Sequence, residues 1–204
     1  MISAALCIRG KYAGVAVRVY VFKPLTTILI IAVALLSAMG AWTPYAVLVL
    51  LAFGFALAGD VFLMLPKDRF LSGLVSFLVA HIFLAMAFLV KGVGFDWWLM
   101  VLAFLTGFTM FGALRPYLGR MRVPAFFYVG VISAMAWLGW EGWLHLGGTG
   151  PALAAFGTVL FLVSDSTLAW NRFRGRFRSA ELIILSTYYM SLFLIALSVS
   201  PGLE

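Results

Sequence analysis

Seven long apolar runs follow one another along this chain, and they constrain its fold more than any other feature. The chain has 204 residues, of which 65% are hydrophobic and 10% are charged. About 20 apolar residues are enough for a helix to cross a bilayer, and the runs lack the alternation of a transmembrane strand. The runs lie at residues 24–42, 44–65, 70–90, 97–114, 123–143, 151–170 and 180–200.

These runs predict an all-α fold, a polytopic transmembrane bundle of seven to eight helices. A soluble domain would carry about a quarter of its residues charged, and a disordered chain would be polar and poor in aromatic residues, so both classes are excluded. The connections are short, so we expect residues 1–204 to form a single integral membrane domain. In it, residues 23–200 form the bundle, and residues 1–22 form either an interfacial helix or a short first span.

Lysine and arginine are distributed unevenly between the connections. Thirteen of the 14 lie in the N-terminal segment or in every second connection, and only Lys91 lies in the others. Because such residues accumulate on the cytoplasmic side, the N-terminal segment and the basic loops are predicted to be cytoplasmic. The expected location is the bacterial plasma (inner) membrane. The basic residues that give the net charge of +7 are then expected to bind lipid headgroups, and no nucleic-acid partner is expected.

Ionisable residues inside membrane spans are rare and usually functional. Asp60 lies seven residues before Lys67, and Asp165 lies seven residues before Arg172. With a rise of 1.5 Å per residue, each carboxylate is expected about 10 Å from the cytoplasmic end of its helix. Two carboxyl groups at one depth, one protonated and one ionised, are suited to general acid and base catalysis.

Further polar groups in the same half of the bilayer predict a cavity open toward the cytoplasmic leaflet. His81 is expected about 18 Å deep, and Lys23, Tyr128, Asn171 and Glu181 are expected near the cytoplasmic mouths of their spans. His81 could instead have a structural role, as a hydrogen-bonding group between helices. Lys23 could instead extend to lipid phosphates. Two histidines and one cysteine do not make a transition-metal site unless carboxylates complete it, so no metal and no cofactor are expected.

Two other function classes use pairs of membrane aspartates. In intramembrane aspartyl proteases a Tyr-Asp helix precedes the Gly-Asp helix, and a Pro-Ala-Leu element follows both. Here Gly59-Asp60 comes first and Pro151 precedes Asp165 on the same span, so that class is disfavoured. A lipid or proton-coupled carrier that uses the aspartates as a relay is the alternative to an enzyme, although we find no inverted repeat of the transporter type.

Six short motifs follow one another between residues 22 and 189. They are Phe22–Thr27, Gly59–Met64, Phe70–Leu74 with Phe77 and Ala80–Ile82, Arg122–Pro124 with Tyr128, Gly157–Ala169, and Thr187–Tyr189. In this order they resemble the YhhN-like lysoplasmalogenase family of integral membrane proteins. The chain departs from that pattern at Leu192, where members commonly have a glutamine, and in its short, charged N-terminal segment, since members commonly have eight spans.

The resemblance implies an ether hydrolase that cleaves the vinyl ether bond of lysoplasmenylethanolamine or lysoplasmenylcholine into a fatty aldehyde and a glycerophospho-alcohol. Asp60 and Asp165 would be catalytic. The six substrate-binding candidates are Lys23, His81, Tyr128, Ser164, Asn171 and Tyr188. The chemistry agrees, because protonation on carbon forms an oxocarbenium ion that a carboxylate can stabilise and water can capture. The implied partners are the lysophospholipid and membrane lipids, and a hydrolase of another ether or ester lysolipid is a further alternative.

Overall fold

The computed structural model describes residues 2–12, 16–66, 69–92 and 94–203. Within these residues the chain is entirely helical, with eight α-helices, three short 3-10 turns and no strand, which confirms the predicted all-α class. The elements are α1 (Ile2–Tyr12), α2 (Ala16–Ser37), α3 (Pro44–Met64), α4 (Phe70–Val90), α5 (Trp97–Leu114), η1 (Arg115–Tyr117), η2 (Gly119–Met121), α6 (Arg122–Leu146), α7 (Thr149–Phe173), α8 (Ala180–Leu197) and η3 (Pro201–Leu203).

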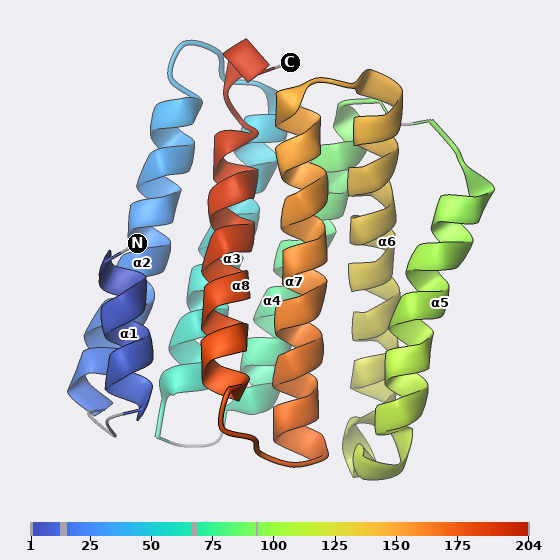
Figure 1. Ribbon diagram of the computed structural model, residues 1–204. Helices are drawn as coiled ribbons and strands as arrows, with labels where there is room; N and C mark the ends of the chain where they lie inside the picture. Colours follow the sequence, from blue (N-terminus) through green and yellow to red (C-terminus); the bar gives the residue numbers. More distant parts are fainter. Residues whose placement is uncertain (1, 13–15, 67–68, 93, 204) are drawn as a thin grey trace.

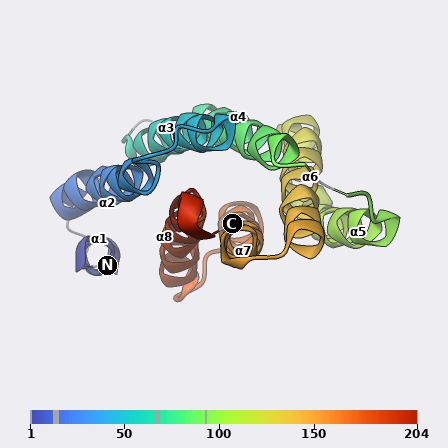
Figure 2. The same cartoon turned by 90° about the horizontal axis from the view of Figure 1, so that it is seen from above.

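In the described part of the chain, seven helices, α2 to α8, are long and apolar enough to cross a membrane. They stand side by side (Figure 1), and the connections rich in lysine and arginine gather at the lower end, which we call the basic end. Seen from above, α2, α3 and α4 form a curved row that α6 closes at one side, while α7 and α8 lie on its concave side (Figure 2). The outermost helix on that side is α5, which packs against α6.

The predicted start of the first span is wrong. The first apolar run begins at Pro24, whereas α2 begins at Ala16 and contains Pro24 in its interior. Proline is tolerated inside membrane helices because neighbouring groups satisfy the freed backbone. The apolar run is interrupted by Arg18 and Lys23, yet the helix continues through both. For Lys23 the reason is a partner inside the bundle, the carboxylate of Asp60, at 3.1 Å.

The short helix α1 bears on the alternatives for the N-terminal segment. Its 11 residues extend about 16 Å, which is about half of the 30 Å hydrocarbon core. It stands beside the lower half of α2 (Figure 1) and also contacts α8. A Cβ atom on Gly10 would lie 2.7 Å from Cβ of Arg18, so only glycine fits this approach to α2. Thus α1 packs upright like a span but is too short to cross the bilayer.

Two glycines fix the helices that carry the membrane aspartates. A Cβ atom on Gly59 of α3 would lie 2.7 Å from the ring of Phe77 on α4, and one on Gly157 of α7 would lie 2.6 Å from Ile195 on α8. Close backbone approach through small residues is typical of helix packing in membranes. The bundle therefore holds α3 tightly against α4 and α7 tightly against α8, and the space between the two pairs contains the candidate site.

Candidate active site

A cavity of about 590 Å³ lies at the basic end, and residues of α1, α2, α3, α4, α7 and α8 and of the connection between α7 and α8 line it. Both membrane aspartates line it, although they are 105 positions apart in the sequence. The cavity also receives four of the six predicted substrate-binding side chains, those of Lys23, Ser164, Asn171 and Tyr188. The other two, His81 and Tyr128, lie directly behind Asp165 and contact it from inside the bundle.

The carboxylate of Asp60 is enclosed by partners and is only 1% exposed. Its Oδ2 accepts hydrogen bonds from the hydroxyl groups of Thr27 (2.6 Å) and Tyr188 (2.8 Å). Its Oδ1 lies 3.1 Å from Nζ of Lys23. Lys23 and Thr27 are four residues apart on α2, so they share one face of that helix. An ammonium group at this distance stabilises the ionised form of a buried carboxylate.

Asp165 has fewer partners, and none of them is a lysine or arginine within the described residues. The hydroxyl of Tyr128 donates a hydrogen bond to its Oδ2, and Nε2 of His81 lies 3.8 Å from the same oxygen. The His81 side chain is completely buried, and its Nε2 has no hydrogen-bond partner in the described part of the chain. The side chain of Asp165 is 12% exposed, and the residue lines the cavity.

An aromatic wall connects the surroundings of the two aspartates. The ring of Phe161 lies 4.6 Å from that of His81 and 5.6 Å from that of Tyr188, measured between centroids. Phe77 packs edge-on against Tyr188 at 5.8 Å, and His81 packs edge-on against Tyr128 at 5.4 Å. Phe77 and His81 are four residues apart on α4, and Phe161 and Asp165 are four residues apart on α7. Each of these two pairs therefore shares one face of its helix. These ring contacts hold the side chains of Tyr188, Tyr128 and His81 in place beside the two carboxyl groups.

Two of the predicted binding residues also hold the helices in place. The hydroxyl of Ser164 donates a hydrogen bond to the backbone carbonyl of Ile184 at 3.1 Å, which ties α7 to α8. The amide oxygen of Asn171 accepts a hydrogen bond from the backbone N–H of Phe177 at 3.3 Å, which fixes the connection between these helices. Both side chains line the cavity, but their hydrogen bonds in the structure are to the backbone.

Positive charge is concentrated where the cavity meets the basic end. Its lining there includes Lys11, Arg172, Arg176 and Arg178. Glu181 also lines this region and lies 3.6 Å from Nζ of Lys11. The mouth therefore carries more positive than negative groups, which is the arrangement that attracts a phosphate.

A second, apolar pocket lies next to the cavity, between α4, α5, α6 and α7. Its walls include Leu74, Met110 and Leu162. Three residues line both spaces, namely Phe70, Asp165 and Leu168. The carboxyl group of Asp165 therefore lies at the boundary between a charged compartment and an apolar one.

Our reading of the sequence missed Thr27 as a member of the site. This residue is completely buried, and its hydroxyl makes the shortest of the hydrogen bonds to Asp60. A signal was present, because Thr27 follows Lys23 by four residues and so lies on the same helix face. The sequence could not show that this face turns toward α3.

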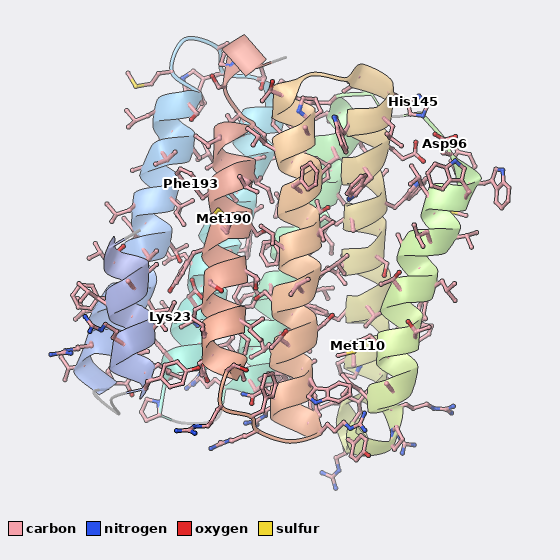
Figure 3. The ribbon with its side chains drawn as sticks, in the orientation of Figure 1. Lys23, Asp96, Met110, His145, Met190 and Phe193 are labelled. Atoms are coloured by element: carbon pink, nitrogen blue, oxygen red, sulfur yellow. The ribbon has the colours of Figure 1, made fainter. Side chains whose placement is uncertain are left out.

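Among the described residues, the potential metal ligands that lie close together are not at the cavity. In the described residues, side chains that could hold an ion together come within reach of one another at Asp96, Glu141 and His145. Figure 3 places Asp96 and His145 at the end of the bundle opposite Lys23. The described side chains of the cavity carry carboxyl, hydroxyl, ammonium and guanidinium groups, and the imidazole of His81 lies behind Asp165.

Comparison with known proteins identifies the family of this chain. The model of the YhhN family matches residues 19–199. The chain belongs to the YhhN family. One relative, the membrane protein YhhN of Escherichia coli O6:H1 (strain CFT073), is 30% identical over 199 residues, which cover 97% of this chain and 94% of the relative.

Mammalian relatives of this YhhN family member carry the name lysoplasmalogenase. TMEM86A of Homo sapiens is 33% identical over 167 residues, which cover 79% of this chain and 68% of the relative. TMEM86B of Sus scrofa is 34% identical over 148 residues, which cover 71% of this chain and 59% of the relative. No solved structure matches the chain significantly. These findings confirm the resemblance inferred from the motifs, and with the seven membrane-length helices among the described residues they show a membrane protein.

Proposed function

We propose that this YhhN family protein is a lysoplasmalogenase, which hydrolyses the vinyl ether bond of a lysoplasmalogen. The position of Asp165 between the charged cavity and the apolar pocket is the observation that carries the proposal. In a lysoplasmalogen the vinyl ether joins the polar glycerophospho-headgroup to the apolar chain. A lipid with its headgroup in the cavity and its chain in the pocket has this bond beside Asp165. The names of the mammalian relatives support the same reaction.

In the proposed mechanism Asp165 is the general acid. Its partners are the phenol of Tyr128 and the fully buried imidazole of His81, and no lysine or arginine in the described part of the chain holds Asp165 in the ionised form. Because Tyr128 occupies Oδ2, the proton of the acid is carried on Oδ1. Asp165 gives this proton to the vinyl carbon remote from the ether oxygen, and the electron pair of the double bond forms the new C–H bond.

Asp60 is the ionised carboxylate of the pair. The proton transfer leaves an oxocarbenium ion, which the negative charge of Asp60 stabilises. Water adds to the cationic carbon and passes one proton to the Asp165 carboxylate, which restores the acid and leaves a hemiacetal. The hemiacetal then breaks its C–O bond to the glycerol oxygen, and its hydroxyl proton moves to that oxygen. This releases a fatty aldehyde and the glycerophospho-alcohol, so one water is consumed and no net proton is produced. Two carboxylates divide oxocarbenium chemistry in a comparable way in glycosidases.

The remaining groups position the lipid. The basic side chains at the mouth, among them Arg176 and Arg178, bind the phosphate of the headgroup. The apolar pocket, with Met110 and Leu162 in its walls, holds the first part of the chain. Single-chain lipids fit this division because one polar and one apolar compartment meet at the reacting bond.

The decisive experiment supplies purified protein with lysoplasmenylethanolamine and measures aldehyde release by mass spectrometry. We expect turnover of the alkenyl lipid and none of the matched alkyl lysolipid, because a saturated ether has no double bond to protonate. In heavy water the aldehyde should contain one deuterium on the carbon next to the carbonyl. The double variant Asp60→Asn with Asp165→Asn should be inactive while keeping the wild-type elution volume.

Two outcomes would contradict the proposal. Aldehyde release that survives the double substitution would exclude the two aspartates as the catalytic pair. Recovery of the intact lipid on the other side of proteoliposomes, with no aldehyde formed, would favour a carrier. Cleavage of an ester lysolipid at a higher rate than the vinyl ether lipid would instead assign another substrate class to the same cavity.

We also propose that the basic end faces the cytoplasm of a bacterial inner membrane, because positive loops remain on that side. Single cysteines in a Cys7→Ala background test this orientation. Trp42→Cys lies in the exposed connection at the opposite end, and Gly175→Cys lies in an exposed connection at the basic end. A membrane-impermeant maleimide should label Trp42→Cys in intact cells and Gly175→Cys only after the membrane is opened. The reverse pattern would overturn the orientation and leave the hydrolase proposal untouched.

A further inference from the structure

Three side chains with metal-binding atoms meet at the end of the bundle opposite the cavity. Glu141 and His145 are four residues apart near the end of α6, and Asp96 immediately precedes α5. Nε2 of His145 lies 3.1 Å from Oδ2 of Asp96 and also 3.1 Å from Oε2 of Glu141. Figure 3 shows Asp96 and His145 close together at the top of α5 and α6.

Glu141 shows that this cluster is more than a surface ion pair. Its side chain is completely buried, and its Oε1 accepts hydrogen bonds from the indole N–H of Trp137 and the backbone N–H of Asp96, both at 2.7 Å. These two donors fix the plane of the carboxylate. The other oxygen, Oε2, has no hydrogen-bond partner in the described part of the chain and is directed at His145. A buried carboxylate oxygen that accepts no hydrogen bond costs folding free energy, and a positively charged partner would offset this cost.

The imidazole alone cannot serve both carboxylates. Nε2 of His145 carries at most one hydrogen, yet it lies at the same distance from an oxygen of Asp96 and an oxygen of Glu141. A single cation among the three atoms serves all of them, because ligands about 2.0–2.2 Å from a tetrahedral ion are separated by roughly 3.3–3.5 Å. The three donor atoms all lie within 4.8 Å of one another.

We propose that Asp96, Glu141 and His145 bind one divalent transition-metal ion of the zinc class. An imidazole ligand favours zinc and related ions over magnesium and calcium, which take oxygen ligands. His145 and Asp96 are partly exposed, with side chains 42% and 37% accessible, so a water can complete the coordination. Trp137 and the Asp96 backbone orient the Glu141 ligand, as outer hydrogen bonds do in metal sites.

The ion would fasten the outermost helix to the bundle. Asp96 lies at the start of α5, and the other two ligands lie on α6, so coordination joins the adjacent ends of these helices. Glu141 is 13 residues from Tyr128 on α6, which is about 20 Å along the axis. The site is therefore structural and independent of the proposed hydrolysis.

The test uses full-length protein without a histidine tag, stripped with EDTA and titrated with Zn²⁺ by calorimetry. We expect saturable binding of one ion per chain and a rise in melting temperature. His145→Ala and Asp96→Asn, at partly exposed positions where folding is preserved, should each weaken binding at least about 100-fold, and Trp137→Phe about tenfold or more. The matched control is Glu181→Gln at the other end, which should bind Zn²⁺ like the wild type.

Absence of saturable Zn²⁺ binding, or equal affinity in the wild type, His145→Ala and Asp96→Asn, would overturn the proposal. Mg²⁺ and Ca²⁺ serve as probes of the ion class, and binding of either as tightly as Zn²⁺ would contradict the assignment to transition metals. Substitution with Co²⁺ gives a second readout, because visible absorption bands should appear in the wild type and be lost in His145→Ala. Vinyl ether hydrolysis is measured separately, so failure of one proposal does not depend on the other.

Discussion

The two sides of the cavity contain the same functional group in opposite settings. On the side of α2, α3 and α8, Asp60 is surrounded by an ammonium group and two hydroxyl groups. On the side of α4, α6 and α7, Asp165 has a phenol and a buried imidazole, and it also borders an apolar pocket. The difference teaches that depth in the membrane is not enough to define a carboxylate, because its partners determine which proton state the bundle stabilises.

The largest effect is expected from the side with fewer partners. Asp165→Asn removes the proton donor and should lower kcat by about 10³–10⁴, within the range of general acid catalysis. Asp60→Asn removes a stabilising charge and should lower kcat by about 10²–10³. Initial rates of aldehyde release measure both. If Asp165→Asn retained activity within tenfold of wild type while Asp60→Asn was inactive, the two roles would have to be exchanged.

The next effect concerns stability on the Asp60 side. Lys23→Met leaves a carboxylate that is 1% exposed without its cation, and should lower the free energy of unfolding by about 3–5 kcal/mol. The double variant Lys23→Met with Asp60→Asn removes both charges and should recover most of that loss, without recovering activity. Thermal and denaturant unfolding in detergent measure the cycle. Additive losses in the double variant would show that the pair is not coupled.

A smaller effect should distinguish the two tyrosines. Tyr128→Phe removes the only hydroxyl that contacts Asp165 among the described residues, so we expect kcat to fall about tenfold. Tyr188→Phe leaves Asp60 with Thr27 and Lys23, so the loss should be two- to threefold. Tyr20→Phe, at an exposed position on α2, is the matched control. Equal losses of kcat in Tyr128→Phe and Tyr188→Phe would contradict the prediction that Asp165 depends more on its tyrosine than Asp60 does.

The smallest effect tests how firmly α1 packs against α2 and α8, next to Asp60. Cys7 is buried against Tyr189, and burial raises the pKa of its thiol, so little thiolate is present at neutral pH. N-ethylmaleimide should therefore label Cys7 slowly compared with an exposed cysteine. Gly10→Ala forces α1 away from Arg18 and should increase the labelling rate severalfold. Fast labelling of the wild type would show that α1 is not docked in solution.

The sequence predicted the membrane helices well because the physical signal is local. An apolar run longer than a bilayer is thick has few other ways to fold, and the run at 70–90 coincides with α4. The prediction of one depth for two aspartates also rested on a local quantity, the distance along a helix from a basic loop. The structure places Asp60 and Asp165 in one cavity.

Features that depend on which helices meet could not be predicted in this way. The start of α2 was misplaced because the charged residue Lys23 was taken as the boundary before the first apolar run. The partner that allows this lysine inside the helix is Asp60 on α3. The cluster at Asp96 was overlooked for the same reason. The spacing of Glu141 and His145 is visible in the sequence, but the third ligand lies 45 positions earlier than Glu141 and becomes a neighbour only when α5 packs on α6.

The residues shared by the two compartments have a consequence for the number of tails a substrate can carry. Phe70, Asp165 and Leu168 border both spaces, and beyond them on the headgroup side the lining contains charged groups such as Lys23 and Arg176. A two-chain plasmalogen would have to place its second acyl chain against these charges, at the cost of leaving them without water. Under the proposed function the charged lining of the cavity therefore disfavours a second tail and favours lysolipids as substrates.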